Sequence, residues 1–229
     1  MTEGVSAGTT GAPLDLLFDL DGTLTDPVVG ITRCIQHAMA GLGRAIPDAS
    51  DLRQFVGPPL RGTFAKLLST SDEGLIARAI GLYRERFAVT GMFENEIYPE
   101  VAVTLDELRA DGHRLWVVTS KPEVYARRII AHFNLTASFR EIYGSELDGR
   151  NSDKVDLIRE VLATERLPPA TTWMIGDREQ DVRGGRSNGT RTAGALWGYG
   201  TEEELRAERP DILMKRMGDL MTHMRRPSW

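Results

Sequence analysis

Short apolar runs alternate with helical patterns along most of the chain. Runs of strand length predict strands over residues 14–18, 114–118, 139–143, 171–175 and 191–196. Apolar residues at helical spacing predict helices that carry Val101 to Leu108, Val124 to Phe133 and Val155 to Leu162, with a last helix after Thr201. Strands that alternate with helices of this length indicate a parallel sheet covered on both faces.

A purely helical pattern interrupts this alternation after the first strand. From Val28 to about Gly91 the apolar positions keep helical spacing and no strand pattern occurs. Glycine, proline and serine punctuate three amphipathic faces, formed by Ile31, Ile35, Ala38 and Leu42, by Phe64, Leu67 and Leu68, and by Ile76, Ile80, Tyr83 and Phe87. We therefore expect a small helical bundle inserted after the first strand.

These patterns predict one α/β domain with an inserted subdomain. We expect a disordered N-terminus (1–13), a core (14–26 and 98–218), a helical cap (27–97) and a C-terminal tail (219–229) that is frayed from Met221. Residues 1–13 lack the apolar run of a signal peptide. Ser152 is a candidate N-cap and Pro122 suits the first turn of a helix. Thr201 with Glu204 forms a candidate capping box.

Composition narrows the possible partners and compartment. The 229 residues carry a net charge of -5, with 41% hydrophobic and 27% charged residues, which is ordinary for a soluble globular protein. No block of like charges points to a nucleic-acid polymer or a membrane surface, and no apolar run reaches spanning length. The single cysteine, Cys34, lies in an apolar helical pattern, so we expect a buried, inert thiol in a reducing, cytoplasmic setting.

Two carboxylates follow the first predicted strand. Asp19 and Asp21 lie two positions apart, so both side chains can point to the same side, just before Gly22. Two like charges this close are costly unless a cation lies between them. This spacing predicts a divalent metal site with an aspartate free to act as nucleophile. A strand that ends in an Asp-Gly turn explains Gly22 but not Asp19.

Further polar groups stand at the ends of the other predicted strands. They are Thr119 and Ser120, Lys154 at a helix start, and Gly176-Asp177 with Asp181. Ligands of open α/β sheets gather at the carboxyl ends of the strands. Carboxylates suit a hard cation, and hydroxyls with a lysine suit a phosphate, so together they predict a phosphoryl-transfer site.

The chain resembles the haloacid dehalogenase superfamily, in its phosphoglycolate phosphatase-like group. The segment from Asp19 to Asp26 matches the first motif of that family, Val117-Val118-Thr119 the second, Lys154 the third, and Gly176-Asp177 with Asp181 the fourth. The resemblance covers roughly residues 14–218. It implies a Rossmann-like parallel sheet as the core and places the helical insertion where the family carries its cap.

The resemblance also implies a role for each motif residue. Asp19 would form an aspartyl-phosphate, and Asp21 would protonate the leaving oxygen and then help to activate water. Mg²⁺ would be held by Asp19, Asp177 and the backbone carbonyl of Asp21, with Asp181 either supporting the metal or bonding the loop. The phosphate oxygens would be bound by Thr119, by the backbone after it, by Lys154 and, unless it caps the next helix, by Ser120.

The same motifs weigh against other reactions. Asp21 disfavours a dehalogenase or a phosphonatase, and Pro27 and Ile31 stand where sugar-phosphate mutases tend to carry threonine and histidine. A receiver-like phospho-acceptor would need neither Asp21 nor a cap. Within the phosphatases, the segments 119–122, 144–145, 176–178 and 196–200 resemble a 5′-nucleotidase-like subgroup. We expect a ribose 5′-phosphate ester as substrate, with phosphoglycolate as the alternative.

The remaining charged and turn residues are not assigned to the site on sequence alone. Lys121 is expected at the surface. Arg33, Arg61 and the Gly57-to-Leu60 turn lie in the predicted cap, where they either contact the leaving group or are ordinary surface and turn residues.

Overall fold

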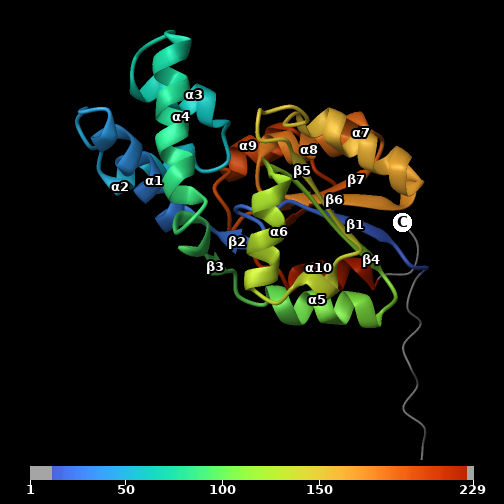
Figure 1. Cartoon of the computed structure of the whole chain (residues 1–229). Coiled ribbons are helices and arrows are strands. Elements are labelled where there is room, and N and C mark those ends of the chain that lie inside the picture. Colours follow the sequence, from blue (N-terminus) through green and yellow to red (C-terminus); the bar gives the residue numbers. More distant parts are fainter. Residues whose placement is uncertain (1–11, 226–229) are drawn as a thin grey trace, which may run out of the picture.

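The computed structural model describes residues 12–225, so most of the N-terminus that was predicted to be disordered lies outside the described residues. Its centre is a six-stranded parallel sheet in the order β5-β4-β1-β6-β7-β8 (Figure 1). The strands are β1 (Asp15–Phe18), β4 (Arg114–Pro122), β5 (Glu141–Ser145), β6 (Thr172–Gly176), β7 (Arg191–Ala195) and β8 (Ile212–Met214). The predicted α/β fold is confirmed.

Helices cover both faces of the sheet. Side chains of β1 alternate between the faces: Leu16 and Phe18 join one buried cluster and Leu17 joins the other. The first cluster is covered by α5 (Val101–Ala110), α6 (Glu123–His132) and α10 (Asp219–Met224). The opposite face carries α7 (Lys154–Glu165) and α8 (Glu179–Ser187), which pack against each other.

The residues between the first and second strands of the large sheet form the predicted helices. These are α1 (Val28–Gly41), α2 (Ala49–Leu52), α3 (Leu60–Leu67) and α4 (Glu73–Phe87), with 3₁₀ turns η1 (Arg53–Phe55) and η2 (Gly91–Phe93). They lie together beside the sheet (Figure 1). Where the chain enters and leaves them, β2 (Thr25–Asp26) and β3 (Glu96–Ile97) form an antiparallel pair that the sequence did not predict.

Several local predictions need correction. Asp153, not Ser152, caps α7, because its carboxylate accepts from the N–H groups of Val155 and Asp156. Pro122 is the N-cap of α6 rather than part of its first turn. Only half of the predicted capping box is seen at the start of α9 (Glu202–Ala207): the Thr201 hydroxyl accepts from the Glu204 N–H, whereas the Glu204 carboxylate accepts from Arg178 and the Glu179 N–H.

The C-terminal part of the chain is more ordered than the sequence suggested. Strand β8 was not predicted, and α10 continues to Met224. Met221 and Met224 are buried in the core cluster. The expectation that the chain frays from Met221 is therefore wrong as far as the described residues reach. The remaining 3₁₀ turns are η3 (Thr136–Ser138) and η4 (Pro169–Thr171).

Close backbone contact joins α1 to the η2 turn. A Cβ atom at Gly30 would lie 2.0 Å from the carbonyl oxygen of Gly91, and backbone atoms cannot move aside as a flexible side chain can. Cys34, one turn further along α1, is fully buried as expected, and Arg86 donates to its sulfur.

Gly30→Ala is therefore predicted to destabilise the protein by about 1–3 kcal/mol, as overpacking does. Gly81→Ala is the matched control, because Gly81 lies inside α4 with open space around the position of a Cβ. That change is predicted to add roughly 0.5–1 kcal/mol through helix propensity. Urea unfolding of both variants measures the difference, and equal effects on the free energy of unfolding would contradict the packing argument.

Candidate active site

The predicted residues converge at the carboxyl ends of three adjacent strands. Asp19 follows β1, Thr119 lies in β4, and Asp177 follows β6. Because β1 is paired with β4 on one side and β6 on the other, the ends of these strands lie side by side. Lys154 is the first residue of α7.

Lys154 is the cation at the centre of this arrangement. Its Nζ lies 3.0 Å from Oδ1 of Asp19 and 2.7 Å from Oδ1 of Asp181, and it donates to the carbonyl of Val118 at 2.9 Å. The residue is only 3% exposed. Burial by itself lowers the pKa of Lys154, but the carboxylates of Asp181 and Asp19 outweigh burial and raise it. The lysine therefore stays charged.

Three carboxylates surround the same point. One oxygen each from Asp19, Asp177 and Asp181 lies within 4.8 Å of the other two. Burial raises the pKa of Asp177 well above its usual range, and the charges of Asp181 and Asp19 raise it further. Burial also raises the pKa of Asp181 to about 6, against the opposing effect of Lys154. A buried group of oxygen ligands with excess negative charge fits a hard divalent cation.

Hydrogen bonds and close-packed glycines hold these carboxylates. Thr23 donates to Asp177 Oδ1 at 3.2 Å and the Tyr199 N–H donates to Oδ2 at 2.8 Å. A Cβ at Gly22, whose φ is +87°, would lie 2.2 Å from the Asp177 carboxylate. Glycine at this turn after β1 is therefore required both by the backbone angle and by the neighbouring carboxylate.

Asp181 has two protein partners for its two oxygens. Oδ1 contacts Lys154, and Oδ2 accepts from the Arg178 N–H at 3.1 Å, at the N-terminus of α8. Asp181 therefore bonds the loop, and it also lies in the carboxylate cluster. Its support of a metal stays a prediction.

Lys121 is part of the site, which the sequence analysis missed. Its Nζ lies 2.5 Å from Oδ2 of Asp21, and only 7% of its side chain is exposed. The expectation that Lys121 lies at the surface is wrong. Burial raises the pKa of Asp21, and Lys121 opposes that rise. No periodicity marks Lys121. The signals were its place two residues after Thr119 on a strand that ends at the site, and its membership of the segment 119–122 that resembles the nucleotidase-like subgroup.

The hydroxyl of Ser120 does not cap the following helix. It donates to the Ser152 carbonyl at 2.8 Å, and the Ser145 hydroxyl donates to the Ser120 carbonyl at 2.9 Å. These bonds tie the end of β4 to β5 and to the loop before Lys154. Thr119 is buried, and its Oγ1 accepts from the Lys121 N–H at 3.3 Å.

The residues of the predicted cap that had two possible roles divide into two groups. Arg33 pairs with Glu94, and Arg61 with Glu73; both arginine side chains are more than half exposed. The turn before α3 instead lies beside the core, because Arg178 donates to the Val56 carbonyl at 3.1 Å.

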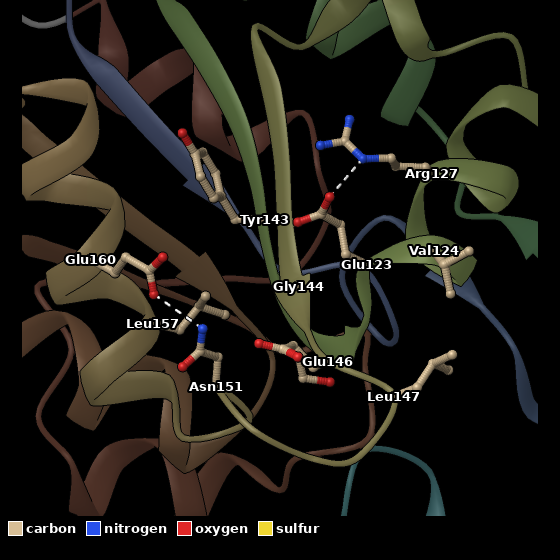
Figure 2. Close-up of a pocket in the computed structure, with 11 residues that line it drawn as sticks. Glu123, Val124, Arg127, Tyr143, Gly144, Glu146, Leu147, Asn151, Leu157 and Glu160 are labelled. Carbon is tan, nitrogen blue, oxygen red and sulfur yellow. Dashed lines mark hydrogen bonds and ion pairs between the residues drawn. The ribbon is translucent and has the colours of Figure 1, made fainter.

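One described cavity lies away from these residues. It has a volume of about 680 Å³, and its walls come from the open side of β5, from α6 and from α7. Figure 2 shows Glu123 directed at Arg127 and Asn151 directed at Glu160 in its walls. Its polar side chains thus already have partners in the protein. The lining includes Ser145 but no member of the carboxylate cluster.

Comparison with known proteins agrees with this geometry. The family of haloacid dehalogenase-like hydrolases matches residues 16–195. The chain belongs to this family. A 5′-nucleotidase from Pseudomonas aeruginosa is 47% identical over 196 residues, 86% of this chain and 88% of the relative. A predicted phosphatase from Clostridium acetobutylicum has a crystal structure with a TM-score of 0.87 and 37% identity, covering 93% of this chain and 98% of that one.

Other relatives differ in their named activities. The tyrosine-protein kinase PtkA from Mycobacterium tuberculosis is 35% identical over 214 residues, 93% of this chain and 69% of the relative. Phosphoglycolate phosphatases are also among the relatives. The chain is a phosphatase of this hydrolase family. Among the helices between residues 12 and 225, none combines the length and apolar character needed to cross a bilayer.

The raised pKa of Asp177 predicts how the metal-free protein responds to pH. The native state holds this proton more tightly than the unfolded state, whose carboxyl titrates near 3.8. The free energy of unfolding in EDTA should therefore fall as pH rises above that value, through the raised pKa. Asp177→Asn should make the fall shallower in urea unfolding between pH 4 and 8. An unchanged slope would show that Asp177 does not carry the effect.

Proposed function

We propose that the chain is a Mg²⁺-dependent phosphomonoester hydrolase that acts through an aspartyl-phosphate on Asp19, with a ribose 5′-phosphate ester as substrate. The observation that carries the proposal is the placement of Asp19 between the ammonium of Lys154 and the buried carboxylates of Asp177 and Asp181. Phosphoryl transfer depends on positioning and on neutralising the charge of the transferred group.

The chain's own residues provide ligands for the cation. Asp19, Asp177 and the backbone carbonyl of Asp21 would hold Mg²⁺, and Asp181 would support the site through Lys154 and the start of α8. Bound there, the cation supplies positive charge for the transferring phosphoryl group and relieves repulsion among the carboxylates. The segment 27–97 would be the cap over this site.

The catalytic steps follow from the two aspartates. A carboxylate oxygen of Asp19 attacks phosphorus, the bond from phosphorus to the ester oxygen breaks, and a proton from Asp21 passes to the departing alcohol. A water molecule then attacks phosphorus and gives a proton to Asp21, so that Asp19 is released and orthophosphate leaves. Lys154, Thr119 and the backbone of Ser120 would bind the phosphate oxygens, because the Ser120 hydroxyl already bonds Ser152.

The residues around Lys121 favour a leaving group that is uncharged and that carries an aromatic ring. Lys121, beside Asp21, lies 4.9 Å from the ring centroid of Phe87, and Phe87 in turn contacts the rings of Tyr83 and Tyr125. Lys121 is already paired with Asp21, so it is less available for the carboxylate of phosphoglycolate. A nucleoside suits such surroundings better. The 47% identity to a 5′-nucleotidase supports the same choice, and phosphoglycolate is the alternative.

Phosphate release across 5′-nucleotides, pentose and hexose phosphates and phosphoglycolate tests the proposal. We predict the highest kcat/KM on 5′-ribosyl phosphates. Asp19→Asn is predicted to lower turnover by roughly 10⁴-fold or more while the unfolding curve keeps its cooperativity. Full activity in this variant would remove the covalent mechanism, and a preference for phosphoglycolate would replace the nucleotide assignment.

Removal of divalent cations gives an independent prediction. EDTA should abolish phosphate release, and added Mg²⁺ should restore it, because the carboxylates repel both one another and the phosphate. Mg²⁺ should also raise the midpoint of thermal unfolding, because a ligand at a hundred times its Kd adds about 2.7 kcal/mol to the free energy of unfolding. Asp177→Asn should weaken both responses. Undiminished turnover in EDTA would contradict a metal role for Asp19 and Asp177.

A further inference from the structure

The side chain of Lys121 connects the catalytic carboxyl of the core with the cap. Its Nζ lies 2.5 Å from Oδ2 of Asp21 and 4.9 Å from the ring centroid of Phe87 in α4. These two partners come from different parts of the chain, one just after β1 and one at the end of α4. The ammonium is therefore held by two separate parts of the chain.

The contact with Lys121 leaves one oxygen of Asp21 free. Oδ1 of Asp21 is buried and has no hydrogen-bond partner among residues 12–225. A buried carboxyl oxygen without a protein partner is costly, which suits an atom whose partner is a substrate or a water molecule. Lys121 thus orients the carboxyl by one oxygen and leaves the other for the substrate.

The environment of Lys121 depends on the position of the cap. Phe87 is 3% exposed, stacks on Tyr83 at 5.4 Å and meets Tyr125 edge-on at 5.2 Å. When α4 is seated, this cluster keeps water from the ion pair. If α4 moves away, Lys121 becomes hydrated, and an ion pair exposed to water contributes only about 0–1 kcal/mol. The Asp21 carboxyl would then lose its fixed orientation.

The backbone around Lys121 is also held closely. The pairing of β4 with β5 is irregular between Val118 and Pro122, and the Lys121 N–H donates to Thr119 Oγ1. A Cβ at Gly144 of β5 would lie 2.6 Å from the Lys121 carbonyl oxygen. The missing side chain at Gly144 lets β5 approach this irregular segment, from which Lys121 reaches Asp21.

We propose that Lys121 is a positioning residue, which aligns the free oxygen of Asp21 with the leaving oxygen of the ester while Phe87 covers it. The inference rests on the proposed function, since it takes Asp21 as the proton donor to the leaving group. Its signature is a dependence on the leaving group. A ribosyl alcohol needs that proton to depart, whereas 4-nitrophenolate departs without it.

The test compares kcat/KM for a 5′-nucleotide and for 4-nitrophenyl phosphate in the same variants. Lys121→Met is predicted to lower the value for the nucleotide at least tenfold more than the value for the aryl ester, because a general acid contributes about 10²–10⁴-fold. Phe87→Leu should also lower the ratio of kcat/KM for the nucleotide to kcat/KM for the aryl ester. The double variant of Lys121→Met and Phe87→Leu should lower this ratio little more than Lys121→Met alone, as expected for residues that act as one unit.

Lys66→Met is the matched control. Lys66 lies 5.3 Å over the ring of Phe55 inside the cap, so the same lysine–aromatic contact is removed away from Asp21. The ratio of the two kcat/KM values should stay at the wild-type value. For Lys121→Met, equal loss on both esters, complete loss included, or a gain on the nucleotide would overturn the positioning role.

The two proposals fail in different ways. If the wild-type protein hydrolyses neither ester, or if Asp19→Asn retains hydrolysis, the proposed function fails. If wild type hydrolyses both, Asp19→Asn hydrolyses neither and Lys121→Met leaves the ratio unchanged, only the positioning role of Lys121 fails.

Discussion

The buried ammonium of Lys154 is the interaction on which the site depends. It lies within 3.0 Å of carboxylate oxygens from both Asp19 and Asp181, in a position almost closed to water. Two unit charges 4 Å apart interact by about 4 kcal/mol at an effective dielectric constant of 20. Without this cation, the three clustered carboxylates would take up protons or separate. The remaining excess of negative charge suits a hard divalent cation.

The topology of the sheet brings this cluster together from distant parts of the chain. Asp19 and Asp177 are far apart in sequence, yet β1 and β6 are paired in register, and the Asp19 N–H donates to the Ile175 carbonyl at 2.9 Å. Helix α7 places Lys154 over the end of β4. The helical insertion begins after β2 and ends before β3, and these two short strands pair with each other close to the end of β1.

The features that repeat along the chain were predictable from sequence. Apolar runs that alternate with helical patterns predicted the parallel sheet. Polar residues at the ends of β1, β4 and β6 predicted the candidate site, because the ends of parallel strands meet at one edge of the sheet. Elements without periodicity were missed. Strand β8 is only three residues long, and the β2–β3 pair has two residues on each side. The direction of Lys121 depends on a strand irregularity and on an aromatic contact with a distant helix, which a linear pattern does not encode.

The central claim is that Asp19 carries the phosphoryl group during the reaction. Rapid acid quench after a single turnover of a 5′-nucleotide, followed by mass spectrometry of the peptides, tests it directly. We predict one phosphoryl group on the peptide that contains Asp19, present at early times, gone at late times and missing without Mg²⁺. Turnover that proceeds with no labelled peptide, or with the label on another residue, would contradict the account.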